Sequence, residues 1–331
     1  MQTIGILGAG AWGTALALVA ARAGKRVILQ AREPEVLEAV KTNGENTPFL
    51  PDVPLTGDIS VTGSCEEAIT GSDAVLLVVP AQFLRSSCKS FSPYWKHGLP
   101  AVVCAKGIEQ KTGALMSEIM AEELPQAPLA ILSGPTFAAE AAREKPTAVT
   151  LACADETLGK RLVKMLGTLS FRPYYSPDVI SVEIGGAVKN VMAIAAGIVE
   201  GKKLGDNARA ALITRGLAEM ARLAVASGGK AETLMGLSGL GDLMLTANST
   251  QSRNFTVGVA LGEGKSLESV LSNRRSVAEG VYTAAAVVER ARSVNVEMPI
   301  CEGLMKIMNE HVPVDDIICS LLSRPFKTEN I

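Results

Sequence analysis

Short apolar runs alternate with helix-like stretches through the first half of the chain. The clearest run, Ala74–Val79, is apolar at every position, which is typical of a strand buried on both faces of a parallel sheet. Helical patterns follow most of these runs, so the order of elements predicts an α/β domain with a parallel sheet. The predicted strands are Thr3–Leu7, Arg26–Gln30, Ile59–Val61, Ala74–Val79, Ala101–Cys104, Leu129–Leu132, Thr147–Ala152 and Phe171–Tyr175. Helices are predicted between them at Thr14–Ala21, Pro34–Val40, Cys65–Ile69, Leu115–Leu124 and Leu158–Leu166.

The pattern changes beyond about Pro177, where strand-like runs stop and stretches rich in Ala, Leu and Met begin. These stretches predict helices at Val182–Val199, Ala208–Ala226 and Thr283–Ala291. Such a change marks a domain boundary, and a length of 331 residues suits roughly two domains. We therefore predict an α/β domain over residues 1–177 and an all-α domain over residues 178–331.

Glycines occupy the first strand-to-helix turn in the spacing G-x-G-x-x-G. Gly8 permits the tight turn, Gly10 lets the backbone approach a pyrophosphate, and Gly13 lets the helix pack close to the strand. The free N–H groups at the helix start would face the phosphate charge. The same glycines would also suit a tight turn without a ligand, but their place between an apolar strand and an Ala/Leu helix favours binding. We predict a doubly wound, Rossmann-type sheet that binds a dinucleotide.

The tip of the second predicted strand bears on the choice between NAD and NADP. An acidic side chain there binds the ribose hydroxyls of NAD, whereas a nearby arginine accommodates the 2′-phosphate of NADP. Here the strand ends at Gln30, and Arg32 and Glu33 follow shortly after. Because no acid stands at the tip itself, Arg32 favours NADP; the alternative is that Arg32 is a solvated loop residue.

Composition removes several classes of function. The net charge is −2, so no basic field indicates a nucleic-acid partner. The six cysteines are scattered without a C-x-x-C pair and the two histidines lie in no motif, which disfavours a zinc or redox site. No apolar run is expected to span a membrane, and the N-terminus lacks a signal-peptide pattern. We expect a cytoplasmic protein whose acid–base chemistry comes from Lys, Asp or Glu.

Two of the polar stretches in the helical half suggest acid–base chemistry. Lys189 lies in an apolar stretch, where burial would lower its pKa toward neutrality and suit it to proton transfer. The alternative is a lysine whose side chain reaches the surface. Asp242 stands beside three glycines within Gly236–Leu243, where it would place a carboxylate near a close backbone approach or simply cap a helix.

The third polar stretch indicates a phosphate. Ser252, Arg253 and Asn254 precede an apolar helical run. Arginine offers a fork of donors and a helix start offers free N–H groups, so this stretch would cradle a phosphate ester. The alternative is a capped loop with a solvent-facing arginine.

Together these stretches resemble one family, the bacterial-type NAD(P)-dependent glycerol-3-phosphate dehydrogenases. The resemblance covers nearly the whole chain and its motifs occur in the family's order, so it is far more specific than the glycine turn alone. Ala11, Ala105 and Thr136 are small departures from the common pattern. The matching segments are Gly8–Ala15, Ala105–Glu109, Ser133–Ala138, Lys189–Val191, Asn207–Gly216, Gly239–Leu243, Ser252–Asn254 and Val277–Val281.

The resemblance implies reversible NAD(P)H-dependent reduction of dihydroxyacetone phosphate to sn-glycerol 3-phosphate, which feeds phospholipid synthesis. It implies a second domain like the C-terminal domain of 6-phosphogluconate dehydrogenase, a homodimer and no metal. Lys189 is the implied proton donor and acceptor, Lys106 polarises and orients the substrate, and Asp242 holds Lys189 or a substrate hydroxyl. The reaction is expected in a cleft between the two domains.

The same resemblance carries over the contact residues. The implied cofactor contacts are Gly8, Gly10, Ala11, Trp12, Gly13, Arg32, Lys106, Ala138, Arg253, Val277 and Glu279. The implied substrate contacts are Lys106, Gly134, Thr136, Lys189, Asp242, Ser252, Arg253 and Asn254.

Two other classes stay open. A β-hydroxyacid or 6-phosphogluconate dehydrogenase shares the two-domain plan, but its lysine and asparagine are spaced Lys-x-x-x-Asn, whereas Asn190 follows Lys189 directly. A non-catalytic NADP-sensing protein would bind the nucleotide without turning over a substrate.

Overall fold

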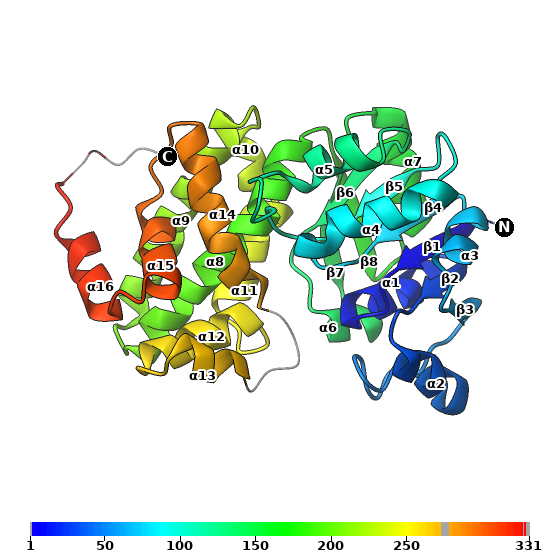
Figure 1. Cartoon of the computed structure of the whole chain (residues 1–331), viewed down its shortest axis with the longest axis horizontal. Coiled ribbons are helices and arrows are strands. Elements are labelled where there is room, and N and C mark those ends of the chain that lie inside the picture. The colour runs from blue at the N-terminus through cyan, green and yellow to red at the C-terminus, as the bar shows by residue number, and fades with distance from the viewer. Residues whose placement is uncertain (1, 273–277, 327, 329–331) are drawn as a thin grey trace. The chain divides into compact units, whose positions relative to one another are not determined.

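The computed structural model describes residues 2–272, 278–326 and 328. The chain divides into two compact units, and one short segment of the first half belongs with the second. Unit 1 comprises Met1–Ala105 and Met116–Val179, whereas unit 2 comprises Lys106–Leu115 and Ile180–Ile331. Figure 1 shows the labelled strands in unit 1 and the long helices α8, α9 and α14 in unit 2.

Unit 1 is built on one eight-stranded sheet in the order β3-β2-β1-β4-β5-β6-β7-β8. The order reverses at the β1–β4 pair, and the strands from β3 to β6 are all parallel, which confirms the predicted doubly wound sheet. The strands are β1 Thr3–Leu7, β2 Arg26–Gln30, β3 Ile59–Thr62, β4 Ala74–Leu77, β5 Ala101–Val103, β6 Leu129–Ser133, β7 Thr147–Ala152 and β8 Phe171–Ser176.

Two details of the sheet differ from the prediction. β7 runs antiparallel to β6, because the only helix between them, α6 (Ala138–Ala142), is too short to act as a crossover helix. β4 ends at Leu77, although an unbroken strand was expected as far as Val79. The neighbouring β1 also stops, at Leu7, and only the Val78 amide still donates to the Leu7 carbonyl, at 2.9 Å.

Most helices of unit 1 match their apolar patterns. The sequence did not predict α4, because most of its residues are polar. In the structure α4 buries Leu84, Cys88 and Phe91 along one face at helical spacing. The helices are α1 Ala11–Arg22, α2 Pro34–Asn43, α3 Cys65–Thr70, α4 Leu84–Phe91, α5 Met116–Glu123, α6 Ala138–Ala142 and α7 Glu156–Leu166, with the short turns η1 Ala81–Phe83 and η2 Ser92–Tyr94.

Unit 2 contains helices and no strand among its described residues, which confirms the all-α second part of the fold. Its core surrounds α8, in which every residue from Ser181 to Val199 is buried. The helices are α8 Val179–Gly201, α9 Asp206–Ala226, α10 Ala231–Leu234, the π-helical turn η3 Leu237–Gly241, α11 Asp242–Ala247, α12 Arg253–Gly262, α13 Leu267–Ser272, α14 Glu279–Ser293, α15 Pro299–Asn309 and α16 Val314–Leu322.

α8 bears on the expectation that no apolar run spans a membrane. Among the described residues it is the single helix long and apolar enough, by length and composition, to cross a membrane. The apolar stretch in question is wholly buried inside the structure, as in the core helix of a globular unit. The isolated charges of Glu183 and Lys189 interrupt the apolar run in the sequence, yet the helix remains apolar enough to pass this test.

In unit 2, α8 and α12 cross with their backbones in close contact. Gly197 and Gly201 on α8 face Gly258 and Gly262 on α12. A Cβ at Gly197 would overlap the Phe255 carbonyl oxygen and come within 2.9 Å of the Gly258 Cα. The absence of side chains therefore lets two backbones touch, and this contact sets where the residues on both helices lie.

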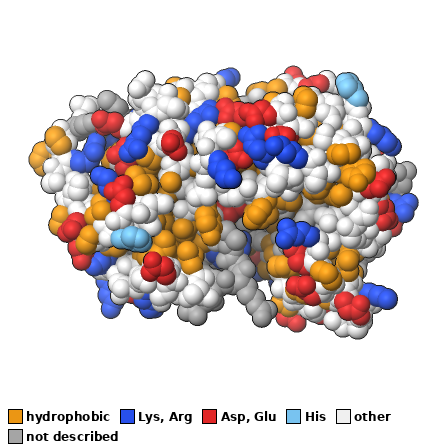
Figure 2. Space-filling view, viewed as in Figure 1, with side chains coloured by type: hydrophobic (Ala, Val, Ile, Leu, Met, Phe, Trp, Pro, Cys, Tyr) orange, Lys and Arg blue, Asp and Glu red, His pale blue; other side chains and the backbone are white. Residues whose placement is uncertain are grey.

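The surface carries mixed charge. On the face shown in Figure 2, acidic and basic side chains are interspersed, in keeping with the net charge of −2.

Candidate active site

The glycine turn of unit 1 has the backbone that its sequence requires. Gly8 has φ +109°, a region that L side chains rarely adopt, and a Cβ there would lie 2.6 Å from the Val78 carbonyl oxygen. A Cβ at Gly13 would overlap the Gly8 carbonyl, so α1 packs against the turn only because position 13 has no side chain. Gly10 differs, since a Cβ there would meet nothing within 4 Å. The space over Gly10 is what a pyrophosphate at the start of α1 needs, so the turn fits a dinucleotide.

Asn46 braces this turn, and sequence reasoning missed it. Its side chain is fully buried, and its amide Nδ2 donates to the Ala9 carbonyl at 2.7 Å and to the Thr14 hydroxyl at 2.8 Å. Its Oδ1 accepts from the Phe49 amide at 3.3 Å. A buried asparagine thus ties the loop after α2 to the glycine turn. The only signal in the sequence was an asparagine between two turn-rich stretches, which by itself does not reveal the partner.

The other cofactor residues predicted in unit 1 lie near the turn or beside it. The Gly8 amide donates to the Gln30 carbonyl at the tip of β2, so the β2 tip adjoins the turn, and the exposed Arg32 lies two residues further on. Ala138, the first residue of α6, joins the same apolar cluster as Ala11 and Trp12. Unit 1 therefore brings these cofactor residues to one region.

Gly134 and Thr136 follow β6 in unit 1. Gly134 has φ +143°, and a Cβ there would lie 2.9 Å from the Val149 Cα on β7. The Thr136 hydroxyl donates to the Gly134 carbonyl at 3.3 Å. The antiparallel β6–β7 pair thus explains this glycine by close backbone contact, independently of any ligand.

The three predicted catalytic residues meet in unit 2. The Asp242 carboxylate, 1% exposed, lies between two ammonium groups: its Oδ1 is 3.0 Å from Lys189 Nζ and its Oδ2 is 2.7 Å from Lys106 Nζ. Lys189 is 7% exposed, so its side chain does not reach the surface. Asp242 begins α11 directly after the π-helical turn, and its carboxylate is engaged by lysines.

Thr246 completes this cluster, and the sequence analysis did not name it. Its hydroxyl accepts from Lys189 Nζ at 2.9 Å and donates to the Asp242 carbonyl at 2.6 Å. Positions 242 and 246 are one helical turn apart, so both side chains face α8. The sequence did contain a signal for Thr246. If a helix starts at Asp242, a polar residue four positions later lies on the same face of that helix as Asp242.

The electrostatics of the cluster suit a proton donor. Burial lowers the pKa of Lys189 to about 8; the charge of Lys106 acts in the same direction, while Asp242 and Glu279 oppose it. For Asp242, burial alone would raise the pKa, but the charges of Lys106 and Lys189 outweigh burial and hold it below its usual value. Below this pKa Lys189 is an ammonium group, held with Lys106 against the Asp242 carboxylate. A cationic N–H donor in this position would stabilise a developing oxyanion.

An asparagine pair lies next to Lys189 along α8. Asn254 Nδ2 donates to Asn190 Oδ1 at 2.9 Å, and Asn254 Oδ1 accepts from the Gly280 amide at 3.0 Å. Ser252 is the N-cap of α12, with its hydroxyl accepting from the Phe255 amide at 3.2 Å. Asn254, a predicted substrate contact, also joins other parts of unit 2 through both ends of its side-chain amide.

The remaining residues expected at the site belong to the same part of unit 2. Arg253 is the first residue of α12, at a helix start as predicted. Glu279 begins α14 and is among the charges that act on Lys189. Val277 lies outside the described residues.

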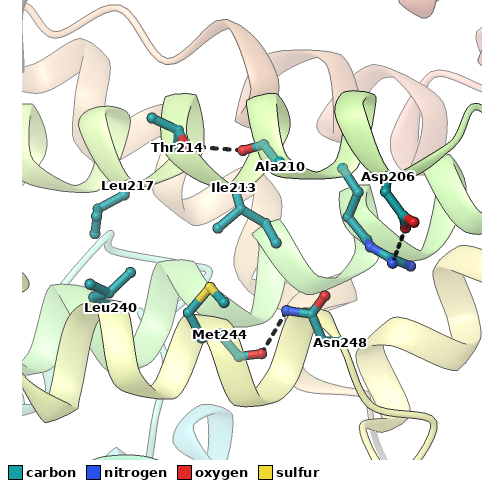
Figure 3. Close-up of a pocket in the computed structure, with 9 residues that line it drawn as sticks. Asp206, Ala210, Ile213, Thr214, Leu217, Leu240, Met244 and Asn248 are labelled. Carbon is teal, nitrogen blue, oxygen red and sulfur yellow. Dashed lines mark hydrogen bonds and ion pairs between the residues drawn. The ribbon is translucent and has the colours of Figure 1, made fainter.

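A separate groove of about 440 Å³ runs between α9 and α11 (Figure 3). Ile213 and Leu217 of α9 face Leu240 and Met244, and none of the predicted site residues lines the groove. Met244 lies two positions from Asp242 on a short helix, so the groove is on the opposite face of α11 from the lysine–aspartate cluster.

Comparison with known proteins identifies the family. The model described as NAD-dependent glycerol-3-phosphate dehydrogenase N-terminus matches residues 3–159, and the corresponding C-terminus model matches residues 178–319. The chain is 57% identical over 326 residues to the glycerol-3-phosphate dehydrogenase (NAD(P)+) of Rhodospirillum rubrum, covering 98% of this chain and 93% of the relative. It is 56% identical over 328 residues to that of Parvibaculum lavamentivorans, covering 99% and 98%.

A solved structure agrees with these matches. The crystal structure of glycerol-3-phosphate dehydrogenase from Coxiella burnetii superposes with a TM-score of 0.93 at 40% identity, covering 98% of this chain and 99% of that one. The resemblance inferred from the motifs is confirmed, and the chain belongs to the NAD-dependent glycerol-3-phosphate dehydrogenase family.

Proposed function

We propose that this chain reduces dihydroxyacetone phosphate to sn-glycerol 3-phosphate, reversibly, with NADPH or NADH. The observation that carries the proposal is the buried cluster of Lys189, Asp242 and Lys106 in a member of this family. Reduction of the ketone places a hydride on the carbonyl carbon and a proton on the carbonyl oxygen. The nicotinamide supplies the hydride when it is bound.

The lysine cluster would supply the proton. Lys189 Nζ would donate one N–H proton to the carbonyl oxygen and become a neutral amine, and the reverse reaction would return that proton. Asp242 and Thr246 hold Lys189 at 3.0 Å and 2.9 Å, which orients its donor atom. Lys106 stays charged beside the developing oxyanion, so its part is electrostatic.

The substrate phosphate and the cofactor would be held by groups already in place. Ser252, Arg253 and Asn254 offer a helix start and a guanidinium for the phosphate. In unit 1 the space over Gly10 and the N–H groups at the start of α1 would hold the pyrophosphate. We assign the cofactor domain to residues 1–177 and the substrate domain to residues 178–331, with the segment that carries Lys106 belonging structurally to the second.

The cofactor preference is part of the proposal. Arg32 is exposed just beyond β2, where the 2′-phosphate of NADPH would bind. We therefore propose that NADPH is favoured over NADH.

Two broader properties complete the proposal: a homodimer and a cytoplasmic location, where the product would enter phospholipid synthesis. Several large apolar side chains of unit 2 are exposed in a single chain, including Val225 at 54% and Met244 at 48%. Light scattering measures the mass in solution, and a monomer at micromolar concentration would contradict the dimer.

The test is consumption of NADPH with dihydroxyacetone phosphate, run beside NADH and beside unphosphorylated dihydroxyacetone. We expect turnover with the phosphorylated ketone alone and a higher kcat/KM with NADPH. Lys189→Ala should lower turnover by about 10²–10⁴-fold while NADPH binding, followed by fluorescence, is retained. Lys265→Ala, on an exposed lysine paired only with Glu263 in the structure, is the matched control. Nucleotide binding with no turnover of any small phosphorylated ketone would instead indicate a sensing protein.

A further inference from the structure

Lys106 reaches the cluster on a ten-residue excursion of the chain. The chain leaves the sheet after β5, and Lys106–Leu115 packs with unit 2 before α5 returns to unit 1. We call Lys106–Leu115 the lysine arm. Ile108 and Leu115 are almost completely buried in the same core cluster as Val188 and Val191 of α8. The lysine arm is therefore packed into the core of unit 2.

Hydrogen bonds close the arm on itself. The Glu109 amide donates to the Ala114 carbonyl and the Gly113 amide donates to the Glu109 carbonyl, each at 2.9 Å. The Thr112 hydroxyl donates to the buried Glu109 carboxylate at 2.5 Å and accepts from the Ala114 amide at 3.1 Å. These bonds join residues 112–114 to Glu109, three positions from Lys106. A displacement of Gly113 would therefore also displace Glu109 and the backbone that carries Lys106.

Arg290 contacts the arm at that point. Its guanidinium Nη1 donates to the Gly113 carbonyl at 3.4 Å, a long hydrogen bond from the last turn of α14. The same helix begins at Glu279 and Gly280, and Gly280 is bound by Asn254. α14 therefore links the lysine arm at one end to the asparagine pair at the other.

We propose that Arg290 is a positioning residue for the reaction: through Gly113 it holds the lysine arm so that Lys106 stays on Asp242 beside Lys189. This inference rests on the proposed role of Lys189 as proton donor. Nothing in the sequence motifs marks Arg290, which stands in an ordinary charged stretch near the end of a helix.

A loosened arm would leave a specific signature. Among the described residues, the charged groups that act on Lys189 are Asp242 from α11, Lys106 from the arm and Glu279 from α14. Lys106 lowers the pKa of Lys189, so withdrawing Lys106 raises it. Reduction needs the protonated lysine, so the pH at which its rate falls would move upward. A general loss of stability would lower the amount of active enzyme without moving that pH.

The experiment compares pH profiles of kcat/KM for ketone reduction in the full-length enzyme. Lys106→Met gives the full effect of removing the charge of Lys106. Arg290→Met tests the proposal, and Arg290→Lys, which keeps a charge and a donor, tests rescue. Arg292→Met is the matched control, because it removes the same charge from an exposed position on the same helix. Thr112→Val loosens the arm from its exposed side without touching Arg290, and serves if Arg290→Met fails to fold.

We expect Arg290→Met to move the inflection upward toward that of Lys106→Met and to lower kcat/KM at neutral pH by up to about 10²-fold. Arg290→Lys should restore most of the kcat/KM and bring the inflection back toward its original pH. Arg292→Met should change neither the inflection nor kcat/KM. The double variant Lys106→Met, Arg290→Met should show no further shift beyond Lys106→Met. An unshifted inflection in Arg290→Met, or an equal shift in Arg292→Met, overturns the positioning role. If Lys106→Met itself leaves the inflection unmoved, the proposed role of the lysine cluster has failed instead.

Discussion

Lys189 shows how much the surroundings of a residue decide its chemistry. In the sequence it is one cation in an apolar helix, equally consistent with a side chain that extends to water. In the structure it is buried and bound by Asp242 at 3.0 Å and Thr246 at 2.9 Å. Burial without a partner would favour a neutral amine; with Asp242 beside it, the ammonium is kept within reach of neutral pH.

The pH dependence of the reaction follows from this balance. Because the pKa of Lys189 is lowered to about 8, the proton donor for reduction is lost as the pH rises through 8, and the base for oxidation appears over the same range. We expect kcat/KM for reduction to fall above about pH 8 and for oxidation to rise there. Rates measured in both directions over pH 6–10 test this, and two flat profiles would contradict it.

Glu219 is a second buried titratable residue, and it lies on α9. It is 2% exposed, and its two oxygens accept from the Ile300 and Cys301 amides at 2.8 Å and 3.3 Å, which caps the start of α15. Burial raises its pKa from 4.5 to about 7, against the opposing effect of these amides and of Arg222. The folded state therefore holds a proton that the unfolded state has released between these two pH values.

The sign of the stability effect follows directly. Because the folded state binds more protons than the unfolded state from about pH 4.5 to 7, the free energy of unfolding falls as pH rises across that window. We expect Glu219→Gln to remove this slope, which amounts to on the order of 3 kcal/mol. Urea unfolding at pH 5 and pH 7.5 measures this slope, with Glu302→Gln, in the first turn of α15, as the control. A slope that persists in Glu219→Gln would assign it to other groups.

At the scale of elements, the α8–α12 crossing decides where the asparagine pair can meet. Its four glycines leave the two backbones in contact, and Asn190 and Asn254 lie on these same two helices. The separation of the helices and the length of the Asn190–Asn254 bond are therefore coupled.

Replacing one of these glycines should disturb both stability and the site. In Gly197→Ala the new methyl group would meet backbone atoms of Phe255, Gly258 and Val259, which cannot move without shifting α12. We expect a loss of about 1–3 kcal/mol or more, with reduced turnover. Gly216→Ala is the matched control: its neighbour is the flexible Met192 thioether at 2.8 Å, so helix propensity should offset the crowding. Thermal melting of both variants tests this, and equal losses would show that backbone crowding is not the cause.

How far the elements follow from sequence depends on how local their cause is. Strands such as β4 and β5 were predictable because each is a continuous apolar run that is buried throughout. The glycine turn was predictable because its spacing is itself the cause of its geometry. α4 was missed because only Leu84, Cys88 and Phe91 of its eight residues are buried, too few to stand out among its polar letters.

The site was predictable in its residues but not in its connections. Lys189, Asp242 and Lys106 were named, yet Asp242 meets Lys189 across 53 positions of the chain and Lys106 across 136, and no local pattern records such contacts. Asn46 was missed for the same reason, since it is an ordinary polar residue until its partner is known. Thr246 differs, because its spacing of four positions from Asp242 is a local signal. Asn254 was identified, but its bonds to Asn190 and Gly280 give it a structural part that the motif did not suggest.

At the scale of the whole molecule, the two units are not two successive halves of the chain. The backbone passes from one unit to the other after Ala105, after Leu115 and after Val179. The lysine arm gives the core of unit 2 two of its buried aliphatic side chains, Ile108 and Leu115.

A fragment cut at the apparent boundary should therefore be defective. We expect residues 178–331 expressed alone to melt broadly, because the loss of Ile108 and Leu115 leaves cavities that cost about 2–5 kcal/mol each. Addition of a peptide spanning residues 105–116 should sharpen the transition, and a peptide with Ile108 and Leu115 replaced by Ser should not. A sharp, cooperative melt of the fragment alone would show that unit 2 does not need the arm.

The arm also limits how this enzyme can exchange parts with its relatives. A hybrid gene joined near position 178 would take its nucleotide half from one parent and its helices from another. With that junction the arm comes from the parent of the nucleotide half. Lys106 and its arm would then pack against the helical core and the Arg290 of the other parent, which fit a different arm. Functional hybrids should be those in which residues 106–115 come from the same parent as the helices of unit 2. The part of the gene that must be exchanged together is then discontinuous.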